Sequence, residues 1–427
     1  MPSLILALAL AAAPAGDAPP TPDVLRAAAA RCDRLLKSSL VDFYLPAEVD
    51  RDRGGYYEAL TGGKFAPTGE KFLVMQARQL WFFSTLALEG IETDAALAAA
   101  KSGYRFLEDH FRDRPNGGYF ARVTDAGGPV DARKHVYLNA FALYGLVAYH
   151  RASGDPAALE AAKALFATLD ARAFDRDHGG YLEFFSDDWR PVVDPKATGY
   201  VGAIGVKTYN THLHVLEAFT ALYRAWPDAR LRDRLDELIV INVQAVRHPE
   251  VACNIDAHHP DWRIVDEPKG LRASYGHDIE CAWLVLDAAE ALGRSPSTLR
   301  GWADTLCKAS LKHGFDRDHG GFFYAGPPGG PADDTRKEWW VQAEALPAML
   351  RLYRLTGDRT YYDAFARTLD FVESHQVAPG GGWYATRKAD GSPQDDRLSS
   401  PWQCAYHDGR ALILSRRWLT GLADGRP

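Results

Sequence analysis

Apolar residues recur along most of this chain at the spacing i, i+3, i+4 and i+7, which is typical of one buried face of an α-helix. The stretches that begin at Phe72, Thr211 and Glu338 are clear examples. The pattern therefore predicts an all-α protein. Twelve helices are expected, over residues 22–40, 72–89, 94–110, 136–152, 156–171, 209–225, 229–246, 276–292, 297–312, 338–355, 359–374 and 402–418.

A glycine pair followed by an aromatic residue separates these helices at regular intervals. It stands at residues 54–56, 117–119, 179–181, 320–322 and 381–383. The interval between the third and fourth copies is about twice the others, so we expect a degenerate sixth copy near residue 250. Six helix pairs predict a closed ring, an (α/α)6 barrel with short β-hairpin loops on one rim. An open solenoid fits the same period, but it usually needs polar capping repeats, and the first and last helices here are apolar.

Two copies of the glycine motif extend to the same seven residues, FDRDHGG. Glycine tolerates positive φ, so the pair lets the chain turn from an outer helix into the next inner helix. Because His178 and His319 recur as part of this turn, we interpret them as turn or capping residues rather than catalysts.

Composition and charge exclude several classes of function. The 427 residues are 47% hydrophobic and carry a net charge of −7, and the scattered lysines and arginines form no basic stripe for nucleic acid. The five cysteines include no CxxC pair, which argues against a disulfide framework or a zinc knuckle. No glycine-rich nucleotide loop precedes a predicted helix, so nicotinamide and ATP chemistry are not expected.

The first residues have the composition of an export signal. An apolar run over residues 4–13 precedes a small-residue site at 13–15, although the usual basic segment is missing. We expect residues 1–20 to be a signal peptide and leader, and residues 21–427 to be a single periplasmic or secreted catalytic domain. A cytoplasmic chain with an apolar start is the alternative. No later stretch has the length of a membrane span, so no membrane partner is expected, and the oligomeric state stays open.

Each predicted inner helix carries polar or aromatic residues near its N-terminal end. In a ring, these residues share one rim around the axis, which is the default location for a binding site. They are Arg78, Tyr137, Asn139, Asn210, His212, His214, His277, Glu280, Trp339, Trp340, Trp402 and His407. The equivalent places of His214, His277 and His407 in their repeats favour catalysis over a buried structural role. We interpret His212 as structural or supporting, because it points to another side of its helix.

Histidines beside an arginine suit the removal of a proton next to a carbonyl. Histidine titrates near neutral pH, and Arg78 would stabilise a developing oxyanion or enediolate. Two bases on opposite faces of C2 would epimerise an open-chain sugar, whereas one base would move the carbonyl, and the spacing leaves both reactions open. The tryptophans favour a carbohydrate ligand over a role in the core.

Two carboxylates lie three residues beyond a histidine, on the same helix face. Glu217 follows His214 and Glu280 follows His277, so each either orients an imidazole or forms an ordinary helix pair. We expect no metal at these pairs, because Arg78 would repel a dication.

The motifs NTHLHVLEA, GHDIECAWL, WWVQAEAL and PWQCAYHDGR occur in this order, and through them the chain resembles the N-acylglucosamine 2-epimerase superfamily, most closely its cellobiose 2-epimerases. The resemblance implies an (α/α)6 barrel that needs no cofactor. It also implies interconversion of glucose and mannose at the reducing end of a β-1,4-linked disaccharide, such as cellobiose or mannobiose. The implied steps are ring opening, removal of the C2 proton, a cis-enediolate, rotation about the C2–C3 bond and reprotonation.

The resemblance also implies residue roles. His277 and His407 match the acid/base pair, His214 matches the histidine that assists ring opening, and Arg78 matches the arginine at the reaction centre. Substrate binding is implied for Trp339, Trp402, Tyr137, Asn210 and Glu280, the last of which is paired with the first base. Ala405 and Asp408 depart from the family's usual pattern, and we expect Asp408 to raise the pKa of His407.

Two other functions remain open. An aldose-ketose isomerase of monosaccharides would use the same fold and would release a ketose. A glycoside hydrolase or a sugar-binding module on an (α/α)6 ring is the other alternative. A hydrolase needs two carboxylates that flank the scissile bond, whereas the inner helices here carry histidines.

Overall fold

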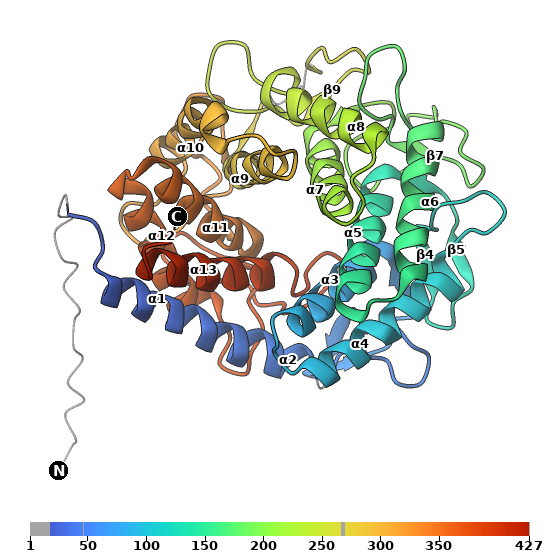
Figure 1. The fold of residues 1–427 in the computed structure, drawn as a ribbon, viewed down its shortest axis with the longest axis horizontal. Coiled ribbons are helices and arrows are strands. Elements are labelled where there is room, and N and C mark those ends of the chain that lie inside the picture. The colour runs from blue at the N-terminus through green and yellow to red at the C-terminus, as the bar shows by residue number, and fades with distance from the viewer. Residues whose placement is uncertain (1–17, 46, 266–269, 427) are drawn as a thin grey trace.

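The computed structural model describes residues 18–45, 47–265 and 270–426, and its helices form a closed double ring (Figure 1). The expected signal segment lies largely outside the described residues. The inner helices are α3 (Leu73–Leu88), α5 (Val136–Ser153), α7 (Tyr209–Ala225), α9 (Tyr275–Ala291), α11 (Trp339–Thr356) and α13 (His407–Ala423). The outer helices are α1 (Pro22–Leu35), α4 (Thr93–Phe106), α6 (Pro156–Arg172), α8 (Ala229–Val240), α10 (Arg300–His313) and α12 (Arg359–Phe371). This arrangement is the predicted (α/α)6 barrel.

Position in the ring explains the composition of each helix. Inner helices such as α3 and α5 bury nearly all their residues, because they lie between the axis and the outer ring. Outer helices such as α12 bury a single stripe. Several outer helices end in a π-helical turn, namely η1 (Leu36–Val41), η2 (Leu107–Phe111), η3 (Ile241–Ala245) and η5 (Val372–Gln376); the remaining short helices are α2 (Asp42–Tyr44) and η4 (Pro296–Leu299). None of the described helices is long and apolar enough to cross a membrane.

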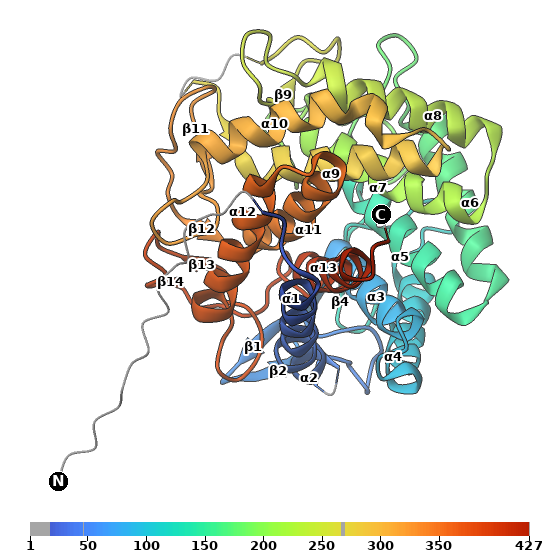
Figure 2. The same cartoon turned by 60° about the vertical axis from the view of Figure 1, so that its left-hand side comes forward.

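The first and last helices close the ring, since α1 packs along α13 (Figure 2). Arg416 of α13 forms ion pairs of 2.9 Å with Asp33 of α1 and with Glu89, directly after α3. Gly409 allows α13 to approach α3 closely, because a Cβ atom at this position would lie 2.6 Å from Cδ2 of Phe82. The chain therefore closes on itself and does not form an open solenoid.

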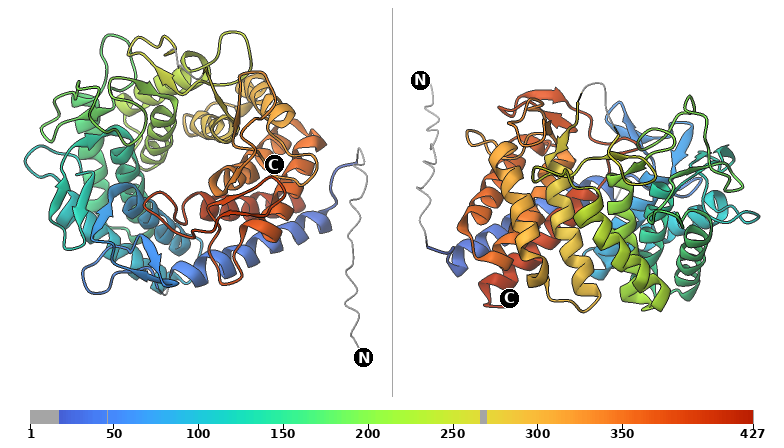
Figure 3. Two further views of the ribbon diagram at one scale, coloured as in Figure 1. Left: turned by 180° about the vertical axis from the view of Figure 1, so that it is seen from behind. Right: turned by 90° about the horizontal axis from the view of Figure 1, so that it is seen from above.

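Short antiparallel strands gather on one rim of the barrel (Figure 3). The strand before an inner helix pairs with the strand that follows the next glycine turn, so the strands join successive repeats. These pairs are β3 (Glu70–Phe72) with β4 (Arg122–Thr124), β6 (Lys134–His135) with β7 (Phe184–Phe185), β8 (Lys207–Thr208) with β9 (Ala257–His258), β10 (Ala273–Ser274) with β11 (Ala325–Gly326), and β12 (Lys337–Glu338) with β13 (Thr386–Arg387). Local hairpins add β1 (Ala59–Thr61) on β2 (Lys64–Ala66), β5 (Pro129–Asp131) on β4, and β14 (Pro393–Asp395) on β13.

The glycine turns share one geometry. Both glycines of all five pairs have positive φ, which L-residues with side chains rarely adopt. At Gly180 the space is also closed, since a Cβ atom would lie 2.7 Å from Nε2 of His212. The predicted sixth turn is present without its glycines, because Arg247 and Asn254 form the bridge that the other turns make.

Four of the turns are each stabilised by a buried ion pair. In each, the turn aspartate binds a lysine that stands two residues before the next inner helix. The pairs are Lys71–Asp50 (2.9 Å), Lys134–Asp113 (2.8 Å), Lys207–Asp175 (2.7 Å) and Lys337–Asp316 (2.8 Å). His178 and His319 stand beside two of these aspartates, with Nδ1–Oδ2 distances of 3.5 and 3.4 Å, so they lie in the turns as predicted.

The last inner helix begins at His407, later than the predicted start at residue 402. The backbone N–H of Gln403 donates to Oγ of Ser400 at 3.0 Å, and the N–H of Ala405 donates to Oε1 of Gln79 at 3.2 Å. Because these N–H groups bind loop and α3 partners, the segment forms a loop. Trp402 therefore lies before the helix and not on it.

Candidate active site

Arg78 on α3 connects three elements at the strand-bearing end of the axis. Its Nη2 donates to Oη of Tyr137 on α5 at 2.8 Å, and its Nη1 donates to the carbonyl oxygen of Trp402 at 3.2 Å. The Tyr137 ring meets the imidazole of His214 edge-on, with centroids 5.2 Å apart. The structure therefore brings Arg78, Tyr137, His214 and Trp402 together.

Trp340 links the other two predicted catalytic histidines. Its ring centroid lies 4.7 Å from that of His277 and 5.9 Å from that of His407. The resemblance had assigned sugar contacts to Trp339 and Trp402, yet Trp340 is the tryptophan that contacts both imidazoles. Trp339 is half-buried, and its Nε1 has no hydrogen-bond partner within the described part of the chain.

Three other polar residues have different surroundings. Nε2 of His212 accepts from the backbone N–H of Tyr181 at 2.9 Å, and Asn139 makes the same contact with Tyr119, so both support glycine turns. Asn210 is half-buried, and its backbone N–H donates to Asp256 at 3.0 Å. Its Oδ1 is buried without a hydrogen-bond partner among the described residues.

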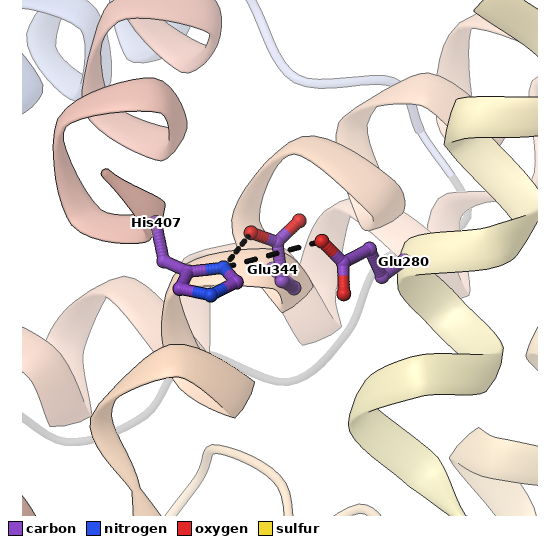
Figure 4. Close-up of side chains that lie close together, drawn as sticks. All are labelled: Glu280, Glu344 and His407. Atoms are coloured by element: carbon purple, nitrogen blue, oxygen red, sulfur yellow. Dashed lines mark hydrogen bonds and ion pairs between the residues drawn. The ribbon is translucent and has the colours of Figure 1, made fainter. Parts of the chain in front are cut away.

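Of the two predicted histidine–glutamate pairs, one forms and the other does not. Glu217 accepts from Nδ1 of His214 at 2.9 Å, as the helix spacing predicts. Glu280 instead accepts from Nη2 of Arg410 at 2.7 Å, one turn deeper than His277. The carboxylate nearest to His407 comes from another helix: Oε1 of Glu344 lies 2.7 Å from Nδ1 of His407, whereas Glu280 lies 4.0 Å away (Figure 4).

Sequence reasoning missed Glu344 and Arg410, although both stand within the motifs WWVQAEAL and PWQCAYHDGR. Nη2 of Arg410 lies 2.7 Å from Oε1 of Glu344 and of Glu280, and Nη1 donates to Glu217. Nε1 of Trp283 completes the set by donating to Glu344 at 3.0 Å. A charged residue between two small residues of an inner helix is the signal that could have identified them, since Glu344 stands between Ala343 and Ala345 and Arg410 between Gly409 and Ala411.

Glu280, Glu344 and His407 bring three potential metal-ligand atoms within 4.8 Å of one another. The same carboxylate oxygens bind Nη2 of Arg410, so a guanidinium already supplies the positive charge at this point. A dication there would face this guanidinium directly and would be repelled. The donor set therefore does not fit a metal ion.

Burial holds the imidazoles in their neutral form. It lowers the pKa of His277 to about 3, with a contribution from the nearby His214, and it also lowers the pKa of His214. Burial, together with Arg78 and Arg410, lowers the pKa of His407 well below its usual value. A neutral imidazole can accept a proton, which is the state that a catalytic base requires.

The expectation that Asp408 raises the pKa of His407 is wrong, because burial and two arginines lower it. The Asp408 carboxyl lies instead in the electrostatic surroundings of Tyr44 and Glu48, and burial raises its own pKa to about 7. Glu217 behaves in the opposite way. Although burial opposes its ionisation, Arg410 and the hydrogen bond from His214 lower the pKa of Glu217 to about 2.

Several known epimerases and isomerases are similar to this chain in sequence or in structure. The cellobiose 2-epimerase of Bacteroides fragilis is 33% identical over 384 residues, which cover 88% of this chain and 96% of that protein. The structure of cellobiose 2-epimerase from Spirochaeta thermophila matches with a TM-score of 0.84 and 33% identity, over 94% of this chain and 98% of that chain. The D-mannose isomerase of Marinomonas mediterranea is 26% identical over 395 residues, 88% of this chain and 94% of that protein.

The family profile of N-acylglucosamine 2-epimerase (GlcNAc 2-epimerase) matches residues 54–411, which include all the residues of the site described above. The relatives are epimerases and isomerases, so this chain is an enzyme of that class. The fold, the matched segment and the relatives lead to one conclusion: the chain belongs to the N-acylglucosamine 2-epimerase family.

Proposed function

We propose that this enzyme inverts C2 of the reducing-end sugar in β-1,4-linked disaccharides such as cellobiose or mannobiose. The carrying observation is that two neutral imidazoles, His277 and His407, contact the same ring of Trp340 in a site that also holds Arg78. The names of the relatives from Bacteroides fragilis and Spirochaeta thermophila support the choice of substrate.

In the proposed mechanism, His214 assists opening of the sugar ring, which exposes the C1 carbonyl. One of the pair His277 and His407 then removes the C2 proton, and Arg78 stabilises the cis-enediolate. Rotation about the C2–C3 bond presents the other face of C2, and the second histidine returns a proton. We propose that the reaction proceeds without a cofactor, because imidazole and guanidinium groups supply every charge that these steps require.

The remaining predicted residues would hold the disaccharide. Trp339 and Asn210 are half-buried, and Nε1 of Trp339 and Oδ1 of Asn210 have no hydrogen-bond partner among the described residues. Trp402 and Tyr137 lie beside Arg78 and would contact the reacting ring. We propose that Glu280 acts through Arg410, which it binds, rather than through His277.

An aldose-ketose isomerase of monosaccharides is the second candidate, and the similarity to a D-mannose isomerase favours it. The same histidines would then move the carbonyl to C2. A glycoside hydrolase is less consistent with the site. Its buried carboxylates Glu217, Glu280 and Glu344 all bind Arg410, whereas a hydrolase needs two carboxylates that flank the scissile bond.

An NMR time course in D2O tests the proposal, with cellobiose and mannobiose in parallel and with EDTA-treated enzyme. We expect the C2 epimer to accumulate with deuterium at C2. A ketose formed from mannose or glucose, with no reaction of the disaccharides, would establish the isomerase instead. Release of monosaccharides would establish a hydrolase.

A further inference from the structure

We propose that Arg410 is a positioning residue shared by two of the histidines, so that one guanidinium holds both carboxylates that orient His214 and His407. The inference rests on the proposed function only in assigning proton transfer to these histidines. Arg410 itself is buried behind them and would not touch the substrate.

The two ends of the guanidinium serve different histidines. Nη1 donates to Oε1 of Glu217, whose Oε2 lies 2.9 Å from Nδ1 of His214. Nη2 lies 2.7 Å from Oε1 of Glu344, and the same oxygen lies 2.7 Å from Nδ1 of His407. Each Nδ1 therefore faces a carboxylate, which places the proton on Nδ1 and leaves Nε2 as the basic nitrogen.

Arginine suits this position better than any other cation. Its planar fork binds several carboxylate oxygens at once, and here it meets a third carboxylate, Glu280, through Nη2. A compact lysine ammonium cannot reach all three groups in this geometry. Burial raises the pKa of Glu280 well above its usual value and also raises the pKa of Glu344, and Arg410 opposes both shifts. Without the cation, the two pKa values would rise further, because the two groups would be buried close together with no positive charge between them.

The neighbours of this network come from every inner helix, and they set the charge around the two histidines. They are Arg78 on α3, Tyr137 and Tyr144 on α5, His214 and Glu217 on α7, His277 and Glu280 on α9, Glu344 on α11, and Tyr406, His407 and Arg410 at the start of α13. Arg410 lowers the pKa of both histidines, in addition to the larger effect of burial. Its removal would therefore let the imidazolium forms persist to higher pH.

Arg410 also borders a cavity near the C-terminal ends of the inner helices, whereas the histidines lie near the N-terminal ends. This cavity of about 570 Å³ is lined by Glu217, Trp283 and Arg410 and by residues near the C-terminal ends of the inner helices, such as Arg354 and Trp418. Truncation of Arg410 would enlarge the cavity toward the carboxylates. A small guanidinium ion could then enter from this end and replace the missing group.

The experiment compares R410A, R410K and a matched control, R354A. Arg354 lines the same cavity, but its guanidinium packs 5.3 Å from the ring of Trp418 and contacts none of the histidines. For R410A we expect kcat to fall about 100-fold, as happens when a group that orients a catalytic histidine is lost, while KM changes little. Added guanidinium should restore part of the lost kcat, whereas methylammonium should not. R354A should retain wild-type kcat.

The pH profile separates the charge of Arg410 from its geometry. The acidic limb of kcat/KM should move up by about one pH unit in R410A, because the histidines keep their protons to higher pH. R410K keeps the positive charge but loses the planar guanidinium. The acidic limb of its kcat/KM profile should therefore stay at the wild-type pH, while kcat falls. If R410A lost kcat/KM equally at every pH, and added guanidinium restored none of its kcat, the proposal would be overturned and Arg410 would have a structural role only.

Nitrogen-15 spectra of the histidine rings give a readout that needs no substrate and can use R410K if R410A does not fold. We expect His214 and His407 of the wild type to carry the proton on Nδ1, and this preference to weaken in the variants. Unchanged ring spectra would overturn the inference. Changed spectra in an enzyme that leaves cellobiose and mannobiose unaltered would support the inference and refute the proposed substrate.

Discussion

Glu344 accepts a hydrogen bond of 2.7 Å from Nδ1 of His407 and so joins the second turn of α11 to the first residue of α13. The two residues stand 63 positions apart, and neither spacing nor motif connects them in the sequence. A carboxylate at Nδ1 fixes the orientation of the ring and stabilises the imidazolium that forms when Nε2 takes a proton. The contact therefore assigns Glu344 a share in the function of His407.

Substitution E344Q tests this assignment. The amide is neutral, and its NH2 group would face either the Trp283 N–H or the Arg410 guanidinium, so the ring would lose its fixed orientation. We expect kcat for epimerisation to fall about 100-fold with a smaller change in KM, measured by steady-state kinetics. The exposed Glu160 on α6 provides the control E160Q. Wild-type kcat in E344Q would show that His407 needs no carboxylate partner.

Exchange of the C2 proton tests the two proposed bases. In H277N and H407N, the exchange of hydrogen for deuterium at C2 should slow by at least about 100-fold, because proton transfer by a positioned side chain contributes this much or more. His178 is half-exposed in a glycine turn, so H178N should exchange at the wild-type rate. A slow H178N variant would argue that loss of stability, rather than of a base, explains all three results.

His212 supports a turn with a hydrogen bond that glutamine makes elsewhere in this chain. Nε2 of His212 accepts from the N–H of Tyr181, as Oε1 of Gln342 accepts from the N–H of Phe322. We therefore expect H212Q to fold with near wild-type stability, whereas H212A would leave a buried N–H unpaired at a cost of about 1–3 kcal/mol. Denaturant unfolding at pH 7.5 measures both values.

The same variant has a defined pH dependence. Burial lowers the pKa of His212 to about 3, so the folded state holds this ring neutral while the unfolded chain takes up a proton below about pH 6.5. This linkage destabilises the wild type as pH falls from 6.5 toward 3. H212Q lacks it and should gain stability relative to the wild type at pH 5. Parallel stability curves for the two proteins would contradict a neutral His212.

The buried pair of Lys337 and Asp316 should contribute more stability than an exposed pair. Nζ of Lys337 binds Oδ2 of Asp316 at 2.8 Å and two carbonyl oxygens, so K337M would leave the aspartate in the turn without its cation. We expect a loss of about 3 kcal/mol in the free energy of unfolding. The exposed pair of Lys308 and Asp304 gives the control K308M, with a loss below about 1 kcal/mol.

The sign of the pH dependence follows from Asp316. Although burial opposes its ionisation, Lys337 and two backbone N–H groups lower its pKa. The stability that this pair contributes is therefore fully present above the pH range in which a carboxyl group ordinarily titrates. It is lost as the pH falls through the lowered pKa of Asp316. The difference between the wild type and K337M should shrink below about pH 4. A difference that stays constant into acid would exclude the ion pair as its origin.

Local patterns in the sequence predicted most of the fold. Helices such as α5 and α7 begin and end within a residue of their predicted limits, because apolar periodicity and glycine positions are local properties. The predicted start of α13 was wrong for a physical reason. The N–H of Ala405 donates to Gln79, which lies 326 residues away in the sequence, and no local sequence pattern indicates this contact.

The sequence by itself determined the ring of helix pairs, the position of the glycine turns, and the candidates Arg78, His214, His277 and His407, since polar groups on apolar inner helices are visible in any linear reading. Only the tertiary structure decided how these groups are used. Glu280 binds Arg410 rather than His277, and Glu344 binds His407, because inner helices that are distant in sequence meet at the axis. There the low polarity of the interior makes each buried charge depend on its partner.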